Sequence, residues 1–278
     1  MELHQNQTRP THVQDEGVSP HINSRLDHPA YIAEGMLRIK VPDEKISWEV
    51  PFPEYDLAEQ DPYTHSAVTT EWEKNGSNGW ASPPDGAVTA ETVTSFYGDI
   101  PTSEDGRVLN PSGRTGIKEG RGLLGKFGAN FAVDPIIFRK NPDTQELELL
   151  LIQRGDTGQW ALPGGMVDDG ESVFETLTRE LKEETSLSLS MDDAEIVYQG
   201  YVDGTRSTDR AWIETTAAFK LLNEEESRSA QVKGGDDAAD AKWFPINGDL
   251  LPTLYASHAH FVGLALKRIE SERLDSFF

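Results

Sequence analysis

Five charged residues in the middle of the chain are spaced as a metal-binding helix would require. Glu171 is followed by Arg179 and Glu180, and then by Glu183 and Glu184, within the run GESVFETLTRELKEET. On a helix the last three glutamates stand at i, i+3 and i+4, so their carboxylates share one face. Holding like charges together costs free energy, which a hard cation such as Mg²⁺ would offset through its preference for oxygen ligands. The spacing predicts a divalent-cation site, with Arg179 bridging to Glu171.

A solvated acidic helix surface is the ordinary alternative for glutamates at helical spacing. Two neighbouring features favour a site. Pro163, Gly164 and Gly165 supply flexible backbone just before the helix, and Leu181 and Leu187 fall where burial is needed.

The whole pattern resembles the Nudix box, which runs from Gly165 through Glu171 to the Arg179–Glu184 core and on to Leu187. Every position matches except Ser186, which stands where the family pattern has glycine and so changes the C-terminal turn of the helix without removing a ligand. The resemblance implies that Glu180, Glu183 and Glu184 are metal ligands, with the Gly165 carbonyl as a further one. It also implies Mg²⁺ or Mn²⁺ as cofactor, and attack of water on a diphosphate phosphorus.

A wider resemblance covers most of residues 35 to 270 and points to one subgroup. The chain is similar to ADP-ribose pyrophosphatases of the mitochondrial type and to the C-terminal domain of melastatin-class TRP channels. The matching stretches include NPSGRTGI from Asn110, GRGLLG from Gly120, AVDPII from Ala132, WALPGG from Trp160, RSTDRAWIET from Arg206 and LYASH from Leu254. The resemblance implies hydrolysis of ADP-ribose to AMP and ribose 5-phosphate. The alternative is an ADP-ribose-sensing channel domain that retains this activity, with the rest of a channel polypeptide as its partner.

Residues outside the box are candidates for substrate contacts. Arg206 has a planar fork that suits phosphate or vicinal hydroxyls, although a surface salt bridge explains it equally well. Tyr255 and His258 resemble family contacts to ribose or phosphate, and the alternative is a helix start capped by Ser257. Three further candidates lie in the matching stretches: Asp134, Leu162 and Trp160. For Trp160, as for Trp212, core packing is the favoured interpretation, although Trp160 could face adenine.

Two assignments of the general base are equally supported by the sequence. Asp237, or its neighbour Asp236, lies in a Gly-rich loop after the box, where many Nudix enzymes carry the base, although such loops are usually turns. Glu183 or Glu184 could serve instead. The sequence leaves this choice open.

Composition limits the possible partners and compartments. The chain has 25 basic and 48 acidic side chains, a net charge of −23, which argues against nucleic acid as a partner. It contains no cysteine, so disulfides and thiolate chemistry are excluded. No apolar run of about 18 residues is present, so no membrane segment is expected in this chain. We expect a cytoplasmic location, or the cytoplasmic face of a membrane channel.

The chain divides by pattern into three parts. Residues 1–30 are polar and aperiodic, and we expect little structure there, either a flexible lead or an irregular wrap. Residues 31–120 are predicted to form a small, irregular N-terminal lobe, and residues 121–278 the Nudix domain. Within that domain we expect α+β architecture, a Nudix α/β/α sandwich with a mixed sheet. The expected strands are 132–139, 147–154, 195–202, 212–221 and 241–246, and the expected helices are 171–184 and 259–274.

Overall fold

A single mixed sheet forms the centre of the molecule. The computed structural model describes residues 21–84, 92–155, 158–235, 238–246 and 249–275. The sheet strands run in the order β3-β2-β1-β6-β5, with β4 paired to β1 and β7 paired to β2. Their bounds are Gly128–Lys140 (β1), Leu147–Arg154 (β2), Trp160–Ala161 (β3), Gly165–Met166 (β4), Glu195–Val202 (β5), Ala211–Leu221 (β6) and Ala238–Pro245 (β7). The predicted mixed sheet is confirmed, because β1 pairs in parallel with β6 and antiparallel with β2.

Two helices cover opposite faces of the sheet, α4 (Val173–Thr185) and α6 (His258–Asp275). Successive side chains of a strand point to opposite faces, so β1 contributes to two separate cores. Ile136 and Phe138 pack with α6, while Val133 and Ile137 pack with α4. This confirms the predicted α/β/α sandwich.

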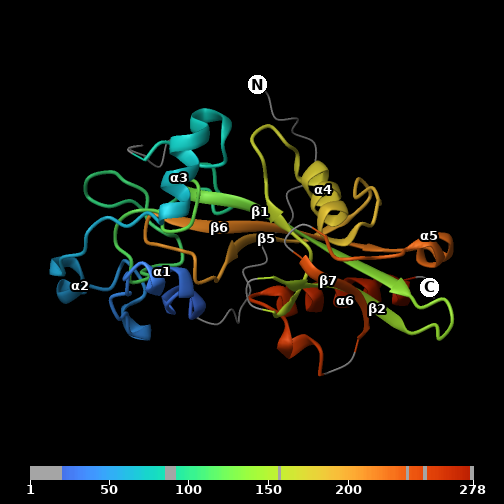
Figure 1. Ribbon diagram of the computed structural model, residues 1–278. Coiled ribbons are helices and arrows are strands. Elements are labelled where there is room, and N and C mark those ends of the chain that lie inside the picture. Colours follow the sequence, from blue (N-terminus) through green and yellow to red (C-terminus); the bar gives the residue numbers. More distant parts are fainter. Residues whose placement is uncertain (1–20, 85–91, 156–157, 236–237, 247–248, 276–278) are drawn as a thin grey trace.

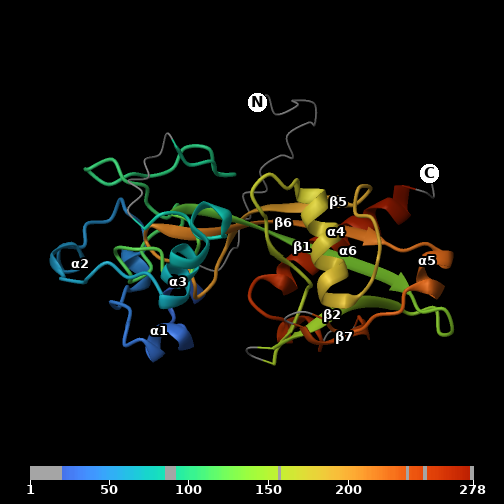
Figure 2. The same ribbon diagram turned by 45° about the horizontal axis from the view of Figure 1, so that its top comes forward.

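The N-terminal part is built from short helices and loops and lies at one end of the sheet (Figures 1 and 2). Its α-helices are α1 (Pro29–Ala33), α2 (Pro53–Leu57) and α3 (Ser66–Asn75), and its 3-10 helices are η1 (Asn23–Arg25), η2 (Asp43–Lys45) and η3 (Gly76–Asn78). The sandwich adds two short elements, α5 (Glu224–Ser229) and η5 (Leu251–Thr253). Strands β1 and β6 extend from the sandwich to this helical part, which thereby shares the sheet.

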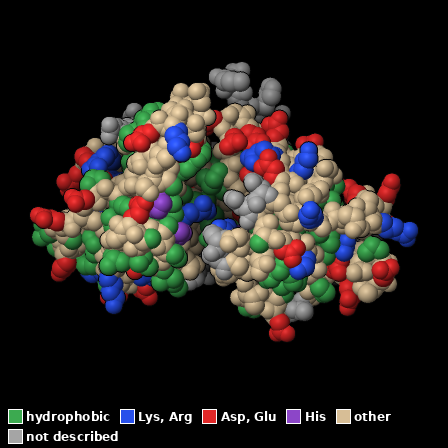
Figure 3. Space-filling model, viewed as in Figure 1, with side chains coloured by type: hydrophobic (Ala, Val, Ile, Leu, Met, Phe, Trp, Pro, Cys, Tyr) green, Lys and Arg blue, Asp and Glu red, His purple; other side chains and the backbone are tan. Residues whose placement is uncertain are grey.

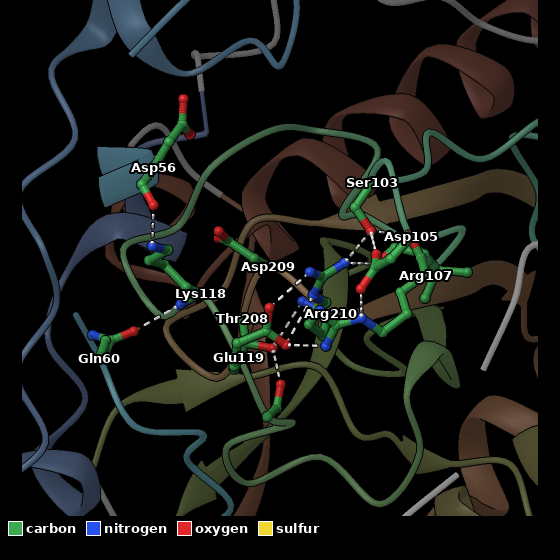
Figure 4. Close-up of polar contacts among 12 residues, drawn as sticks. Asp56, Gln60, Ser103, Asp105, Arg107, Lys118, Glu119, Thr208, Asp209 and Arg210 are labelled. Atoms are coloured by element: carbon green, nitrogen blue, oxygen red, sulfur yellow. Dashed lines mark hydrogen bonds and ion pairs between the residues drawn. The ribbon is translucent and has the colours of Figure 1, made fainter. Parts of the chain in front are cut away.

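Polar contacts join the helical part to the segment that leads into β6 (Figure 4). The guanidinium of Arg210 donates to both carboxylate oxygens of Glu119, at 2.7 and 3.2 Å. The buried carboxylate of Asp209 accepts hydrogen bonds from Thr115, through both its backbone N–H and its hydroxyl, and from the hydroxyl of Tyr55. Because these donors lie in distant parts of the chain, the start of β6 is fixed by the N-terminal part.

The expectation of little structure before residue 30 is wrong for residues 21–30. Asn23–Arg25 form a 3-10 helix and α1 begins at Pro29. The side chains of His21 and Ser24 are buried. The Ser24 hydroxyl bonds to Asp203 and Tyr201, and His21 Nδ1 bonds to the Tyr201 hydroxyl, which helps so polar a segment to pack. Residues 1–20 lie outside the described part of the chain.

The expected elements of the sandwich are found with small shifts at their ends. The box helix starts at Val173 rather than at residue 171, because Ser172 is its N-cap. The last strand starts at Ala238 rather than at residue 241. Among the described residues, no helix combines the length and the apolar character needed to cross a membrane.

Candidate active site

The helix that carries the box is fixed at its start by a capping box. The hydroxyl of Ser172 accepts from the N–H of Glu175, and the Glu175 carboxylate accepts from the N–H of Ser172. These two bonds satisfy backbone donors that a helix N-terminus otherwise leaves open. Leu177 and Leu181 are fully buried on the inner face of α4, and Glu180, which lies between them in the sequence, is directed toward the glycine loop.

Arg179 connects the carboxylates of the box. It donates to Glu171 through Nε and Nη2, both at 2.9 Å, which confirms the predicted bridge. Its Nη1 donates to Glu180 at 2.7 Å and to Glu183 at 3.1 Å. The hydrogen bonds from Arg179 are the main reason why the pKa of Glu171 lies below its ordinary value. One cation therefore balances three carboxylates.

Glu180 is held against the glycine loop that precedes the helix. A Cβ atom at Gly165 would lie 2.3 Å from Glu180 Oε1, so only glycine leaves space for this carboxylate. Burial raises the pKa of Glu180 above its ordinary value, against the opposing effect of Arg179. A carboxylate that is costly to ionise and lies against the Gly165 backbone fits a cation-binding group.

Glu184 and Glu183 differ in their surroundings. Glu184 is buried, and its Oε2 accepts a hydrogen bond of 2.8 Å from the N–H of Gly164. Glu183 is exposed, with 45% of its side-chain surface accessible. Glu184 thus holds the glycine loop, whereas Glu183 reaches solvent beside it.

Ser186 ends α4 in the left-handed conformation, with φ of 61°. Its N–H donates to the carbonyl of Lys182, as in a glycine-terminated helix. The family pattern has glycine here because this conformation costs other residues free energy. Serine keeps the turn, and no box ligand is lost.

A buried polar chain joins α6 to the sheet. His258 Nδ1 accepts from the N–H of Leu162 at 2.8 Å, and His258 Nε2 lies 3.4 Å from Asp134 Oδ1. The other oxygen of Asp134 accepts from the hydroxyl of Thr215 at 2.6 Å. Because Nδ1 accepts a hydrogen bond, the ring proton is on Nε2, which faces Asp134, and burial lowers the pKa of His258.

The box and this chain open into one cavity of about 540 Å³. In Figure 3 the surface is hollowed between the half with the N-terminal helices and the half with α4, and charged side chains gather on the α4 side. The cavity collects ten predicted site residues: Asp134, Leu162, Gly165, Arg179, Glu180, Glu183, Glu184, Arg206, Tyr255 and His258. Its size suits a small-molecule ligand.

Two predicted residues that the structure describes do not line the cavity. Glu171 accepts a hydrogen bond from Arg179, which agrees with its predicted structural role, and does not line the cavity. Trp160 packs its ring edge-on against Phe244, with centroids 4.6 Å apart, which agrees with the core-packing interpretation; it does not line the cavity. Its carbonyl accepts from the N–H of Tyr255 and so positions a residue that does. Asp237 lies outside the described residues.

Arg154 is a cavity residue that the sequence reasoning missed. It ends β2, and its guanidinium lies 4.4 Å from the centre of the Tyr255 ring. A basic residue after the apolar run LELLLIQ was the available signal, because a charge at a strand end often borders a site. Thr215 and Met166 also line the cavity without having been predicted.

Comparison with known proteins places this fold and site in one family. Residues 131–263 match the NUDIX domain, and residues 41–128 match the NUDT9-like N-terminal domain. The chain is 37% identical to the putative nudix hydrolase 6 of Caenorhabditis elegans, over 88% of this chain and 96% of the relative. The chain belongs to the Nudix hydrolases.

Within that family, two further relatives share both halves of the chain. The mitochondrial ADP-ribose pyrophosphatase of Rattus norvegicus is 35% identical over 91% of this chain and 80% of its own length. A subfamily M member-like 2 transient receptor potential channel of Nematostella vectensis is 34% identical over 80% of this chain, which corresponds to 16% of the channel. The similarity therefore includes both free pyrophosphatases and part of a channel.

Proposed function

We propose that this protein hydrolyses the diphosphate of ADP-ribose to AMP and ribose 5-phosphate. The observation that carries the proposal is the composition of the cavity. The carboxylates of α4 line it together with two arginines, Arg154 and Arg206, from other elements. The rat relative, named as an ADP-ribose pyrophosphatase, supports this substrate.

Arg154 and Arg206 offset the repulsion between the acidic chain and an anionic diphosphate. A chain of net charge −23 repels a diphosphate unless local cations are supplied. Arg154 and Arg206 supply guanidinium groups, which bind phosphate oxygens through paired N–H donors. The guanidinium of Arg154 lies over the ring of Tyr255, 4.4 Å from its centre, and this contact helps to hold Arg154 in the cavity.

Mg²⁺ or Mn²⁺ suits a set of oxygen ligands near Gly165. We propose Glu180, Glu183 and Glu184 as its ligands, with the Gly165 carbonyl as a further one, and the close approach of the Glu180 carboxylate to this glycine supports that set. Among the described residues no three acids or histidines are already grouped as metal ligands, and Arg179 Nη1 donates to both Glu180 and Glu183. Binding would therefore require Arg179 to give up its contacts to these two and keep those to Glu171. When bound, the cation would neutralise diphosphate oxygens and favour ionisation of the attacking water.

In the reaction, water adds to one phosphorus, the bridging P–O bond breaks and the bridging oxygen leaves with the other phosphate. A carboxylate must accept the proton of the attacking water. Glu183 is the accessible carboxylate of the box, Glu184 is held by Gly164, and Asp237 keeps its place as a candidate from the sequence.

A product assay tests the proposal. Purified protein is incubated with ADP-ribose, NAD or ADP-glucose, each with and without Mg²⁺, and AMP is measured. We expect AMP from ADP-ribose with Mg²⁺, and much less from the other two. The Glu183→Gln/Glu184→Gln double variant should be folded by circular dichroism and inactive. Hydrolysis of the other diphosphates without turnover of ADP-ribose would contradict the substrate assignment.

The similarity to a channel favours a second candidate, an ADP-ribose-sensing domain that retains hydrolase activity. Both functions use the same cavity. Sequencing the complete transcript distinguishes them, because a channel domain requires membrane segments encoded in the same reading frame. If the domain belongs to a channel, its location is the cytoplasmic face of a membrane. If the protein is a free enzyme, its location is either the predicted cytoplasm or the mitochondrion that the rat relative's name indicates.

A further inference from the structure

Arg206 enters the cavity from a loop without regular secondary structure. This loop, residues 203–210, joins the end of β5 at Val202 to the start of β6 at Ala211. Gly204 and Arg206 line the cavity. Because the loop has no strand partner of its own, other groups must fix its backbone.

Two side chains of the N-terminal part hold three consecutive carbonyls of this loop. The hydroxyl of Tyr31 donates to the carbonyl of Arg206 at 2.6 Å. Nη2 of Arg38 donates to the carbonyls on either side, those of residues 205 and 207, at 2.6 and 2.9 Å. The backbone that carries the Arg206 side chain is thus fixed at the residue itself and at both neighbours.

Tyr31 and Arg38 are themselves firmly held. Tyr31 is 1% exposed, and its hydroxyl accepts from the N–H of Leu123 at 2.9 Å. A Cβ at Gly122 would lie 2.1 Å from that hydroxyl, so the glycine makes room for it. Arg38 donates also to the carbonyls of Leu26 and Thr115. Each side chain is therefore held by contacts besides those to the loop.

At the start of the loop a loop side chain, and not a loop carbonyl, accepts the hydrogen bonds from the N-terminal part. The carboxylate of Asp203 accepts from the backbone N–H groups of Ile22, Asn23 and Ser24 at 2.8 to 2.9 Å, and from the Ser24 hydroxyl at 2.7 Å. The first turn of η1 thereby closes on this side chain. Residues 21–38 contact the loop at positions 203, 205, 206 and 207.

From these contacts we propose that residues 21–38 act as a clamp that positions Arg206 for the substrate, with Tyr31 and Arg38 as its positioning residues. No residue of 21–38 lines the cavity, so the effect of the clamp on catalysis would pass through the loop. This inference rests on the proposed function, because it assigns Arg206 to binding ADP-ribose.

The test is Tyr31→Phe, which removes one hydroxyl. It leaves the Arg206 carbonyl and the Leu123 N–H without their shared partner, so the loop should move. We expect KM for ADP-ribose to rise about tenfold, equivalent to ~1.4 kcal/mol, with kcat within about twofold. Arg38→Lys, which keeps the charge and loses the fork, should act in the same direction and serves if Tyr31→Phe folds poorly.

A double-mutant cycle separates positioning from general stability. If Tyr31 acts through Arg206, Tyr31→Phe should change KM little in an Arg206→Ala background. Ser227→Ala is the control, since it removes another buried hydroxyl, one that donates to the carbonyl of Leu222, outside both the loop and the cavity. It should lower stability and leave KM unchanged. The clamp would be overturned if the control raised KM as much as Tyr31→Phe does. It would also be overturned if Tyr31→Phe raised KM as much in the Arg206→Ala background as in the wild type.

Amide hydrogen exchange gives a readout that needs no turnover. In Tyr31→Phe the amides of residues 204–207 should exchange faster than in the wild type, and those of α4 should be unchanged. Wild-type protein that releases no AMP would refute the proposed function while leaving this measurement decisive for the clamp. Active wild-type protein with unchanged KM and unchanged exchange in Tyr31→Phe would refute the clamp alone.

Discussion

The carboxylate of Glu180 occupies the position from which a side chain at Gly165 would grow. A Cβ there would lie within 2.3 to 2.6 Å of both carboxylate oxygens and of the carbon between them. Glycine is therefore required at position 165 because a side chain there would collide with Glu180, and not because the backbone is left-handed.

Gly165→Ala should consequently damage the site more than the fold. Displacing Glu180 by about 1 Å should lower kcat/KM on the order of 100-fold, because catalytic groups tolerate little misplacement. Steady-state kinetics and thermal unfolding of the same sample measure both effects. Gly263→Ala in α6 is the control, since a Cβ there meets nothing within 4 Å. Equal kinetics for the two variants would contradict the role assigned to Gly165.

The two cavity arginines should contribute mainly to binding. Arg206→Ala and Arg154→Ala should each raise KM for ADP-ribose by about 10- to 100-fold, because a charge-assisted contact to phosphate is lost. Arg206→Lys should recover only part of this, since lysine lacks the fork. Initial rates over a range of ADP-ribose concentrations provide the values. Arg228→Ala, an exposed residue paired with Glu224 on α5, should behave as wild type.

Stability should fall as the pH falls below about 6.5. Burial lowers the pKa of His21 to about 4, and its Nε2 has no hydrogen-bond partner. Burial also lowers the pKa of His258. Below pH 6.5 the unfolded chain binds protons that the folded chain does not, so protonation favours unfolding. For His21 the loss between pH 7 and pH 5 should be about 2 kcal/mol.

Urea unfolding at pH 7 and pH 5 measures this loss. His21→Gln should have a smaller difference between the two pH values than the wild type, whatever its absolute stability. A histidine NMR titration with both signals near pH 6.5 would show that the premise is wrong.

Ser186→Gly should stabilise the protein. The left-handed φ of 61° costs serine about 1 kcal/mol, and glycine adopts it freely. Part of that gain is offset by the greater freedom of glycine in the unfolded chain and by loss of the Ser186 hydroxyl contact to the Lys233 carbonyl. A net increase of about 0.5 kcal/mol in the free energy of unfolding is expected. Ser186→Ala, which loses the hydroxyl but keeps the strain, should be destabilising instead.

The sandwich and the box were predictable because they rest on local patterns. The apolar run along 147–154 indicates a strand, and the helical stripe at Leu177 and Leu181 indicates a helix with one buried face. The bridge from Arg179 to Glu171 followed from the box in the same way.

What escaped prediction depends on partners far away in the chain. His21 and Ser24 look like residues of a flexible lead, and only Asp203 and Tyr201 show why they are buried. The placement of Arg154 beside Tyr255 results from chain folding that brings β2 to the start of α6. No periodicity encodes such contacts, since each depends on the assembled sheet.

The contacts of Asp203 also constrain how the chain acquires its structure during synthesis. Ile22 and Asp203 are separated by 181 positions, and β1 must await β6 for its parallel partner. The ribosome therefore delivers the N-terminal segment long before its acceptor exists, and such distant pairings form slowly because they must close long loops. The segment around Ile22 is thus among the last to reach its final contacts, so the nascent chain is exposed to aggregation and to proteases until β6 has been made.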